Sequence, residues 1–217
     1  MSTGQINITN TTQGRFAKLA RLGEQVFHTN DLANLWDISN KNTLYTALKR
    51  YTKAGLIFRI YRGLYSIKPV DKIDTHLLGV KVLHKFAYIS TETILVNAGI
   101  ILQDIKYITI VSSESKKFSV GSIDYRSRQL NDKFLFQKEG IDIKNGVNIA
   151  TIERAVADLL YFQPNFYFDN PNQIDWDKVG KIQKNIGYPI APQSRTSSVV
   201  TTPPRGTTLS HDYDIAK

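Results

Sequence analysis

Seven residues between positions 41 and 53 have the side chains that proteins use to bind DNA. Lysine and arginine neutralise phosphate charge, and asparagine and arginine hydrogen-bond the edges of adenine and guanine. On a helix that advances about 100° per residue, the seven share one side; they are Lys41, Asn42, Tyr45, Thr46, Lys49, Arg50 and Lys53. Arg59, Tyr61 and Arg62 follow shortly after them. The pattern predicts a DNA-binding surface.

The opposite side of this helix is apolar, which is what a helix needs to be held against a core. Its residues are Leu44, Ala47, Leu48, Tyr51 and Ala54. Ser39 or Asn40 can cap the first turn, and Gly55 stands where a left-handed residue would end the helix. Local chemistry therefore specifies both ends.

The elements around this helix complete a known order. Thr29 is a suitable N-cap for a first helix that reaches Trp36, and residues 37–39 form a short connection. After Gly55, residues 56–60 and 64–67 are predicted strands, joined by a reversal at 61–63. Arg59, Tyr61 and Arg62 are expected to project at this wing. This order is a winged helix-turn-helix, whose second helix enters the major groove while the wing reaches the neighbouring backbone or minor groove.

Charge supports this interpretation. Residues 1–68 contain 10 Lys and Arg against 3 Asp and Glu, a net +7, whereas the rest contains 18 against 16, a net +2. Clustered cations favour a polyanionic partner, because each neutralised phosphate releases condensed counterions. Two alternatives remain open at this point: a basic helix face that is only a solvated surface, and a winged unit that contacts a protein with little affinity for DNA.

The second part of the chain is predicted to be α+β, since helices, strands and helices follow one another without regular alternation. The predicted helices cover residues 74–86, 92–96 after a cap at Ser90, 152–160 after a cap at Thr151, and 176–186. The predicted strands cover residues 107–111, 118–120, 123–125 and 134–136. The resulting organisation is a flexible segment 1–13, a winged domain 14–69, an α+β domain 70–190, and a disordered tail 191–217 rich in Ser, Thr, Pro and Gly.

Three blocks in this order resemble the AbiEi-type antitoxins of bacterial abortive-infection and toxin-antitoxin systems. They are RIYRGLY at 59–65, YISTETILVNAGI at 88–100 and ATIERAVADLL at 150–160. The resemblance spans residues 14–188 and implies an antitoxin that represses its own operon and counteracts a nucleotidyltransferase-type toxin. The implied partners are double-stranded DNA of its own promoter and that toxin. The oligomeric state on DNA stays open, a dimer included.

Within the third block, Arg154 and Asp158 are four residues apart and can pair on one helix face. The pair is interpreted in two ways: as part of a capped, internally paired core helix, or as functional residues of the antitoxin domain that face the toxin. The first interpretation is favoured, because such pairs are common.

Enzymatic activity is not expected. His28, His76, His84 and His211 are scattered, cysteine is absent, and no glycine-rich phosphate loop occurs, so no catalytic residue, metal or cofactor is assigned. The remaining enzyme hypothesis is a metal-dependent nuclease built from Asp104, Asp124, Glu139 and Lys144. It would need two carboxylates about 4 Å apart across bound ions.

The chain also lacks an apolar run of the ~18 to 20 residues that cross a membrane, and its start lacks the features of a secretory signal. A soluble intracellular protein without membrane contact is therefore expected, and the resemblance to AbiEi-type antitoxins implies the cytoplasm of a bacterium or archaeon.

Overall fold

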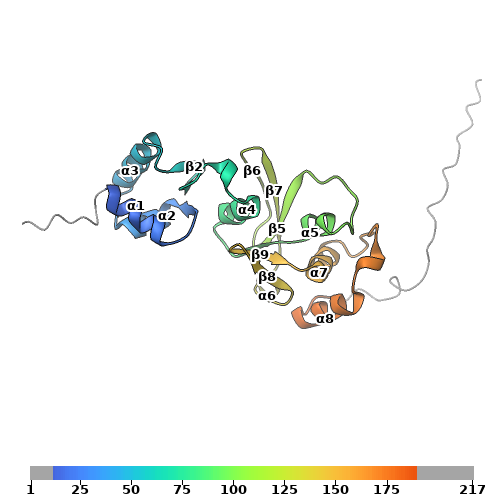
Figure 1. Cartoon of the computed structure of the whole chain (residues 1–217). Helices are drawn as coiled ribbons and strands as arrows, with labels where there is room; N and C mark the ends of the chain where they lie inside the picture. Colours follow the sequence, from blue (N-terminus) through green and yellow to red (C-terminus); the bar gives the residue numbers. More distant parts are fainter. Residues whose placement is uncertain (1–11, 190–217) are drawn as a thin grey trace, which may run out of the picture.

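The computed structural model describes residues 12–189, which form an α+β fold, as predicted. The N-terminal elements surround a small sheet of strand order β1-β3-β2, with antiparallel pairing throughout. They are α1 (Thr12–Arg21), β1 (Val26–His28), α2 (Thr29–Trp36), α3 (Lys41–Lys53), β2 (Phe58–Tyr61) and β3 (Leu64–Ser66). Figure 1 shows them at one end of an elongated molecule.

A larger mixed sheet organises the rest, with strand order β6-β7-β5-β4-β9-β8. Its strands are β4 (Ala87–Ile89), β5 (Tyr107–Ser112), β6 (Lys116–Val120), β7 (Ile123–Gln129), β8 (Ile141–Lys144) and β9 (Val147–Ala150). The helices are α4 (Thr75–Leu83), α5 (Glu92–Asn97), α6 (Asp132–Leu135), α7 (Ile152–Phe162) and α8 (Trp176–Ile186), with 3-10 turns at Val70–Lys72 and Pro171–Gln173.

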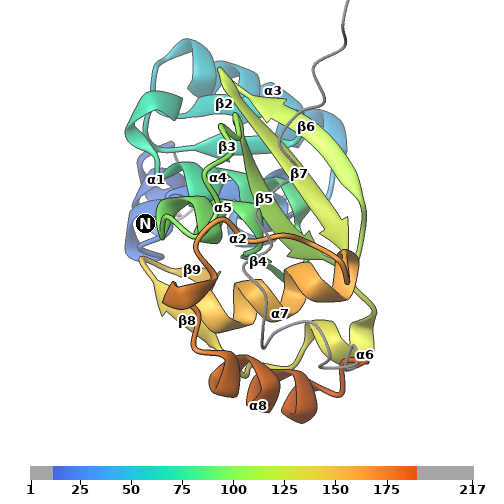
Figure 2. The same cartoon turned by 90° about the vertical axis from the view of Figure 1, so that its right-hand side faces the viewer.

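Helices cover both faces of this sheet, because its strands bury residues alternately on either side. On β5, Ile110 packs in the hydrophobic cluster that includes α4, and Val111 packs in the cluster that includes α5 and α7. Figure 1 shows the sheet between these helices, and Figure 2 shows α8 outside α7. The N-terminal elements have a third cluster of their own, centred on Trp36.

The two parts of the fold share one of these clusters. Val26 of β1 and Leu64 of β3 pack with residues of α4 and of the larger sheet. Across the same joint, Lys81 Nζ lies 2.8 Å from Glu24 Oε2, and the Tyr61 and Phe118 rings are 6.4 Å apart. The boundary expected near residue 69 is therefore a packed junction rather than a free linker.

Two histidines stack at this junction. The rings of His28 and His84 have centroids 3.6 Å apart and are inclined by 21°. His28 Nε2 lies 2.5 Å from the Lys81 carbonyl oxygen, and His84 Nε2 lies 3.7 Å from Asp31 Oδ1. Burial is the main cause that lowers the pKa of His28, so the neutral ring is favoured there.

The predicted strand at 134–136 is wrong. Residues Asp132–Leu135 form the short helix α6, because Asn131 Oδ1 accepts a hydrogen bond from the Lys133 amide at 3.1 Å and caps the turn. The turn buries the consecutive residues Phe134 and Leu135 together. The sequence interpretation also missed β1, β4, β8 and β9, which are only three or four residues long.

The predicted helix ends differ by small amounts. Helix α1 was not predicted; it begins at Thr12, two residues before the domain boundary placed at residue 14. His28 rather than Thr29 precedes α2, and Thr91 rather than Ser90 precedes α5. Ala54, assigned to the buried side of α3, is an exposed C-cap residue. The expected tail, 191–217, and most of the expected flexible segment, residues 1–11, lie outside the described residues.

Across residues 12–189, none of the helices combines the length and the apolar character that crossing a bilayer requires.

Candidate nucleic-acid interface

Helix α3 is held by one apolar side. Its residues Leu44, Ala47, Leu48 and Tyr51 are buried, and the Tyr51 ring meets Trp36 of α2 edge-on at 5.4 Å. Asn40 Oδ1 accepts hydrogen bonds from the amides of Asn42 and Thr43 at 2.9 and 3.1 Å. Gly55 follows the helix with φ +69°, a conformation that glycine adopts without strain. The predicted buried side and both helix ends are confirmed, except at Ala54.

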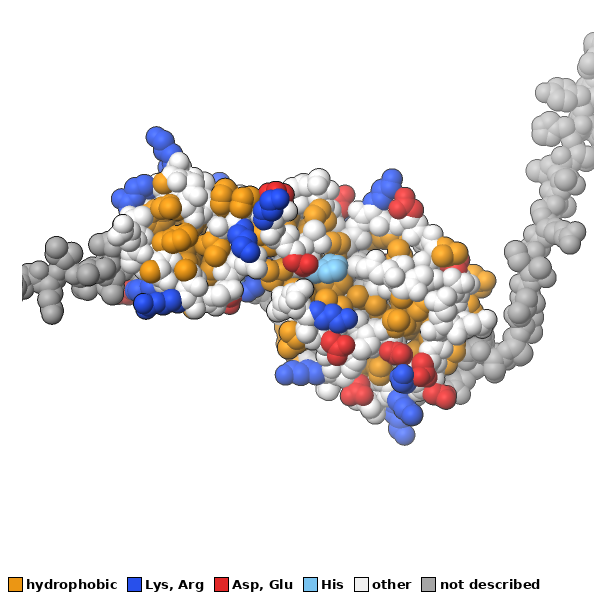
Figure 3. Space-filling view, in the orientation of Figure 1, with side chains coloured by type: hydrophobic (Ala, Val, Ile, Leu, Met, Phe, Trp, Pro, Cys, Tyr) orange, Lys and Arg blue, Asp and Glu red, His pale blue; other side chains and the backbone are white. Residues whose placement is uncertain are grey.

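The other side of α3 faces solvent. All seven predicted residues, Lys41, Asn42, Tyr45, Thr46, Lys49, Arg50 and Lys53, are exposed. Within residues 12–189, none of the four cations among them takes part in an ion pair. Figure 3 shows Lys and Arg side chains projecting from this end of the molecule, with few acidic side chains near them in that view. The helix therefore presents uncompensated positive charge.

The β2–β3 hairpin adds two further exposed cations, Arg59 and Arg62. Its reversal uses Gly63 at φ +72°. The Gly63 carbonyl accepts hydrogen bonds from the Thr29 amide at 2.9 Å and from the Thr29 hydroxyl at 3.0 Å. The start of α2 thus holds the hairpin tip.

Tyr61 differs from its two neighbours. Its side chain is half-buried and packs towards Phe118 of β6. The pairing of β2 with β3 shifts register between Arg59 and Tyr61, which turns the two side chains differently from a regular strand. The prediction that Tyr61 projects with Arg59 and Arg62 is therefore wrong, because Tyr61 joins the two parts of the fold.

Arg154 and Asp158 form the predicted i, i+4 pair, with 2.8 Å between Nε and Oδ1. Both side chains are 0% exposed. Arg154 also donates from Nη1 to the carbonyl oxygens of Gln137 and Glu139, at 3.0 and 2.9 Å, and from Nη2 to the Tyr88 hydroxyl at 2.7 Å. The guanidinium is thus fully engaged inside the protein.

Asp158 is engaged to the same degree. Its Oδ2 accepts hydrogen bonds from the hydroxyls of Ser90 at 2.7 Å and Tyr88 at 3.0 Å, and its Oδ1 accepts one from Tyr188 at 2.6 Å. Burial and the Asp158 charge raise the pKa values of Tyr88 and Tyr188. Burial opposes the charge on Arg154, but Asp158 together with Tyr88 and Tyr188 outweighs burial, so the pKa of Arg154 is raised. Arg154 therefore keeps its charge, and neither residue reaches the surface to touch a partner.

The carboxylates of the nuclease hypothesis do not converge. Asp104 pairs with Lys106 at 3.9 Å, Asp124 accepts a hydrogen bond from Ser119 at 2.6 Å, and Glu139 accepts one from Asn185 at 3.4 Å. In the described part of the chain, no three His, Asp or Glu side chains are placed to hold a metal ion. This geometry gives the nuclease hypothesis no support.

Two residues that the sequence interpretation did not single out carry unsatisfied groups. Thr91 has φ +53° and ψ −128°, a strained conformation that costs a non-glycine residue about 1 to 3 kcal/mol. Its buried hydroxyl has no hydrogen-bond partner among the described residues, and neither has Oε2 of the adjacent buried Glu92. Strain of this kind has no signal in the local sequence.

Comparison with known proteins adds little to this geometry. No protein-family model and no curated protein matches the chain. Among solved structures, the chain is similar to the RV2827C protein from Mycobacterium tuberculosis, with 12% sequence identity and a TM-score of 0.48. The match covers 80% of this chain and 70% of the other. Nothing about fold or function follows from a likeness at this level.

Proposed function

We propose that residues 14–69 form a winged helix-turn-helix that binds double-stranded DNA, with α3 in the major groove and the β2–β3 hairpin as the wing. One observation carries the proposal: α3 is anchored by a buried apolar side and presents exposed, unpaired cations on the other. The major groove of B-DNA is about 12 Å wide and admits a helix of this kind. Arg59 and Arg62 supply the positive charge of the wing.

The unpaired state of these cations matters as much as their number. A lysine held in an internal ion pair must give up that partner before it binds phosphate, whereas a solvated lysine gives up only water and gains from counterion release. Lys41, Lys49 and Lys53 are of the second kind within the described structure, whereas Arg50 has no ion pair there but lies over the Tyr51 ring, with 5.3 Å between Cζ and the ring centroid. Asn42 and Tyr45, on the same side, supply groups that can reach base edges.

The biological role that we propose comes from the resemblance to AbiEi-type antitoxins. The winged unit would bind the operator of its own promoter and repress transcription, and residues 70–190 would counteract a nucleotidyltransferase-type toxin. We propose no catalytic step for this chain. Arg154 and Asp158 would serve antitoxin activity by holding the domain together, since both are buried.

A gel-shift titration on the sequence upstream of the gene, at several salt concentrations, tests DNA binding. Lys49→Ala and Arg62→Ala are each expected to weaken binding and to reduce the slope of log K against log salt by about one unit per lost phosphate contact. Lys144→Ala is the matched control, because Lys144 is exposed on β8 of the second part of the fold. It is expected to leave affinity and slope unchanged.

If Lys49→Ala and Arg62→Ala bind DNA with the same affinity and salt slope as the wild type, as Lys144→Ala is expected to do, this docking face is ruled out. Weak binding that does not distinguish the upstream sequence from unrelated competitor DNA would instead favour the alternative, a winged unit that contacts the toxin directly. The exposed ring of Tyr45, 54% accessible on the cationic side, is the feature that favours a protein partner. Titration of the toxin against Tyr45→Ala would then test that alternative.

A further inference from the structure

The larger sheet ends in two edge strands that differ in charge. Figure 2 shows β8 at one margin of the sheet and β6 at the other, in agreement with the strand order. An edge strand carries backbone groups that no neighbouring strand has paired, so it can pair with a further strand. On β6, the adjacent residues Lys116 and Lys117 are exposed, so two copies of this edge would bring only positive charges together. On β8, the exposed residues Asp142 and Lys144 have opposite charges.

The hairpin that β8 forms with β9 fixes which of its backbone groups point outwards. Lys144 pairs with Val147 across a two-residue turn. The turn residues, Asn145 and Gly146, have φ angles of +51° and +77°, as in a type I′ turn. In such a hairpin the residues that flank the turn are hydrogen-bonded to each other, and the next pair along, at Ile143, is not. The N–H and C=O of Ile143 therefore point away from β9.

The residues around Ile143 agree with this alternation. Two positions earlier, the Ile141 N–H also points outwards, and it donates to the Lys138 carbonyl oxygen at 3.0 Å. Among residues 12–189, no loop or turn supplies a backbone partner of this kind to Ile143, whose side chain is 75% exposed. In the same part of the chain, neither Asp142 nor Lys144 takes part in an ion pair. The edge thus presents a donor, an acceptor, an aliphatic side chain and one charge of each sign.

We propose that β8 pairs antiparallel with β8 of a second copy of this chain, about a two-fold axis that passes between the two Ile143 residues. In this register each Ile143 N–H donates to the other Ile143 carbonyl oxygen, and the two aliphatic side chains meet on one face of the joined sheet. Residues one step to either side of the axis lie opposite each other. Asp142 of each copy therefore faces Lys144 of the other, and all four charges are paired.

The order of the charges selects both the occupant and the register. Centring the pair on Asp142 or on Lys144 would place like charges directly opposite each other, which is destabilising. A basic strand of the β6 type could pair with Asp142 but would bring its own lysines against Lys144. A second copy of β8 supplies an acidic and a basic residue at the required spacing.

The contact is small, which sets the strength of the dimer. Stable protein complexes bury about 1,200 to 2,000 Å², more than a four-residue strand offers, so we expect a weak dimer with a dissociation constant in the micromolar range or above. The pairing uses neither α3 nor the β2–β3 hairpin, so it does not depend on the proposed DNA binding. At the nanomolar concentrations of a gel shift the chain is monomeric, and Lys144→Ala remains a suitable control there.

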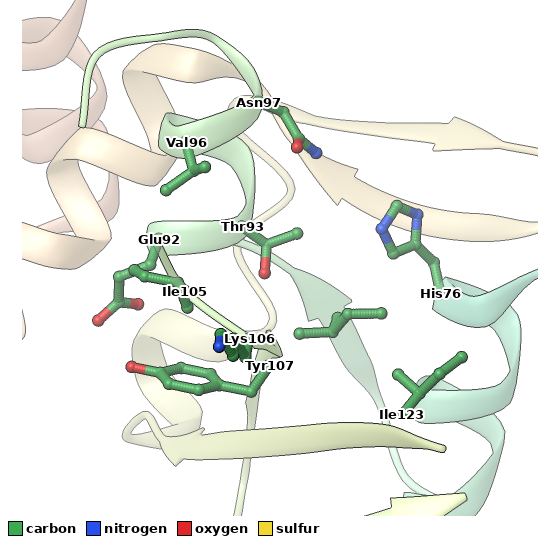
Figure 4. A pocket seen from close by; sticks show the side chains of 10 residues that line it. His76, Glu92, Thr93, Val96, Asn97, Ile105, Lys106, Tyr107 and Ile123 are labelled. Carbon is green, nitrogen blue, oxygen red and sulfur yellow. The ribbon is translucent and has the colours of Figure 1, made fainter. Parts of the chain in front are cut away.

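A cavity elsewhere on the same sheet offers less to a partner. It measures about 230 Å³ and lies between α5 and the segment that leads into β5, with Glu92 on one side and His76 on the other (Figure 4). Glu92 Oε1 is paired with Arg128, and Oε2 is enclosed by protein, so this carboxylate holds no acceptor ready for a ligand. The accessible groups of the sheet lie at β8 instead.

Sedimentation equilibrium of the full chain without DNA, from micromolar to millimolar concentration, tests the proposal. The wild type is expected to form a reversible, concentration-dependent dimer. Asp142→Lys and Lys144→Asp are each expected to raise its dissociation constant at least about tenfold, because each variant places like charges opposite each other at two points. Both residues are exposed, so neither change is expected to disturb the fold.

Restoring the charge pairs separates the proposed register from a general loss of function. The double variant Asp142→Lys with Lys144→Asp exchanges the signs but keeps opposite charges face to face, so it is expected to dimerise like the wild type. An equimolar mixture of the two single variants is expected to form heterodimers, since an edge with two lysines then meets an edge with two aspartates. Mixing would not repair a misfolded variant.

A substitution on the axis locates the interface. Ile143→Lys places two positive charges next to each other at the centre of the pairing and is expected to weaken the dimer at least about tenfold. Leu102→Lys is the matched control, because Leu102 is 70% exposed and lies outside the sheet, in the segment before β5. It is expected to leave the dissociation constant unchanged.

Each alternative outcome has its own meaning. A wild type that stays monomeric up to millimolar concentration would overturn the proposal and leave this edge to a strand of another protein. A dimer that tolerates Ile143→Lys would place the interface elsewhere, and single variants that are not rescued by mixing would overturn the antiparallel register. Gel shifts with Lys49→Ala and Arg62→Ala do not depend on any of these results, so failure here and failure of the proposed function can be told apart.

Discussion

The two parts of the molecule treat arginine in opposite ways. Arg50 on α3 is exposed and has no acidic partner among the described residues. Arg154 on α7 is 0% exposed and donates to Asp158, to a tyrosine hydroxyl and to backbone carbonyls. Both side chains carry the same charge on helices that are each anchored by an apolar side.

The difference teaches how to separate a binding cation from a structural one. A solvated cation contributes little to folding and keeps its charge available for a partner. A buried cation is fully committed, because its desolvation is tolerable only if every donor is satisfied inside the protein. By charge alone, Arg50 and Arg154 are equally good candidates for binding a partner. Their burial and hydrogen-bond partners show that only Arg50 is accessible, whereas Arg154 is held inside the protein.

The largest expected effect comes from replacing Arg154 with methionine, which is compared with the same replacement at Arg50 in a separate variant. Arg154→Met is expected to reduce the free energy of unfolding by about 3 to 5 kcal/mol, because it leaves the Asp158 charge buried without its cation. Arg50→Met is expected to change stability by no more than about 0.5 kcal/mol. Urea denaturation of the two variants measures both values.

The double variant Arg154→Met with Asp158→Leu sharpens this test. Removing both charges is expected to restore part of the stability lost in the single variant, since no buried charge remains unpaired. A single variant that keeps wild-type stability but loses the proposed antitoxin activity would contradict the structural role and point to direct function for Arg154.

An intermediate effect is expected at the start of α3. Asn40→Ala removes the cap of two amides and should cost about 1 kcal/mol of stability. The matched control is Ser39→Ala, because Ser39 is also exposed but does not cap the helix. Thermal unfolding of both variants measures the difference. Equal unfolding temperatures would mean that packing alone fixes the first turn.

The smallest effect concerns pH at the junction of the two parts. The pKa of His28 is lowered in the folded chain, chiefly by burial, so below pH 6.5 the unfolded chain binds more protons at this residue. Stability is therefore expected to fall as the pH drops below 6.5, with the nearby Asp31 carboxylate offsetting part of the loss. The contribution of His28 is measured by comparing the unfolding midpoints of the wild type and His28→Gln between pH 8 and pH 5. If His28→Gln loses more stability than the wild type as the pH falls, His28 does not destabilise the folded chain in acid and the expected direction is wrong.

The sequence predicted those features that depend on neighbours along the chain. The two sides of α3, a cap at Ser39 or Asn40, the left-handed Gly55 and the i, i+4 pair of Arg154 and Asp158 all follow from spacings of a few residues, and the structure places the cap at Asn40. Helical periodicity and capping chemistry act over such distances, so they can be seen without a fold.

Features that depend on distant segments could not be predicted in the same way. Tyr88, Ser90 and Tyr188 meet Asp158 across 70, 68 and 30 residues of chain. Tyr61 was expected to project from the wing with Arg59 and Arg62, because nothing near it in the sequence indicates that Phe118 packs against it. The predicted strand at 134–136 failed because a capped turn overrides the β preference of its aromatic residues.

The hydrophobic cluster shared by the two parts has a consequence for dissecting the protein. A fragment cut after residue 69 would lose the neighbours of Val26 and Leu64, which are 1% and 0% exposed in the intact chain. Newly bared aliphatic surface of this kind favours self-association. In a test of the proposed DNA binding, truncation would thus confuse a loss of solubility with a loss of affinity. Point substitutions on the whole chain give the cleaner assignment.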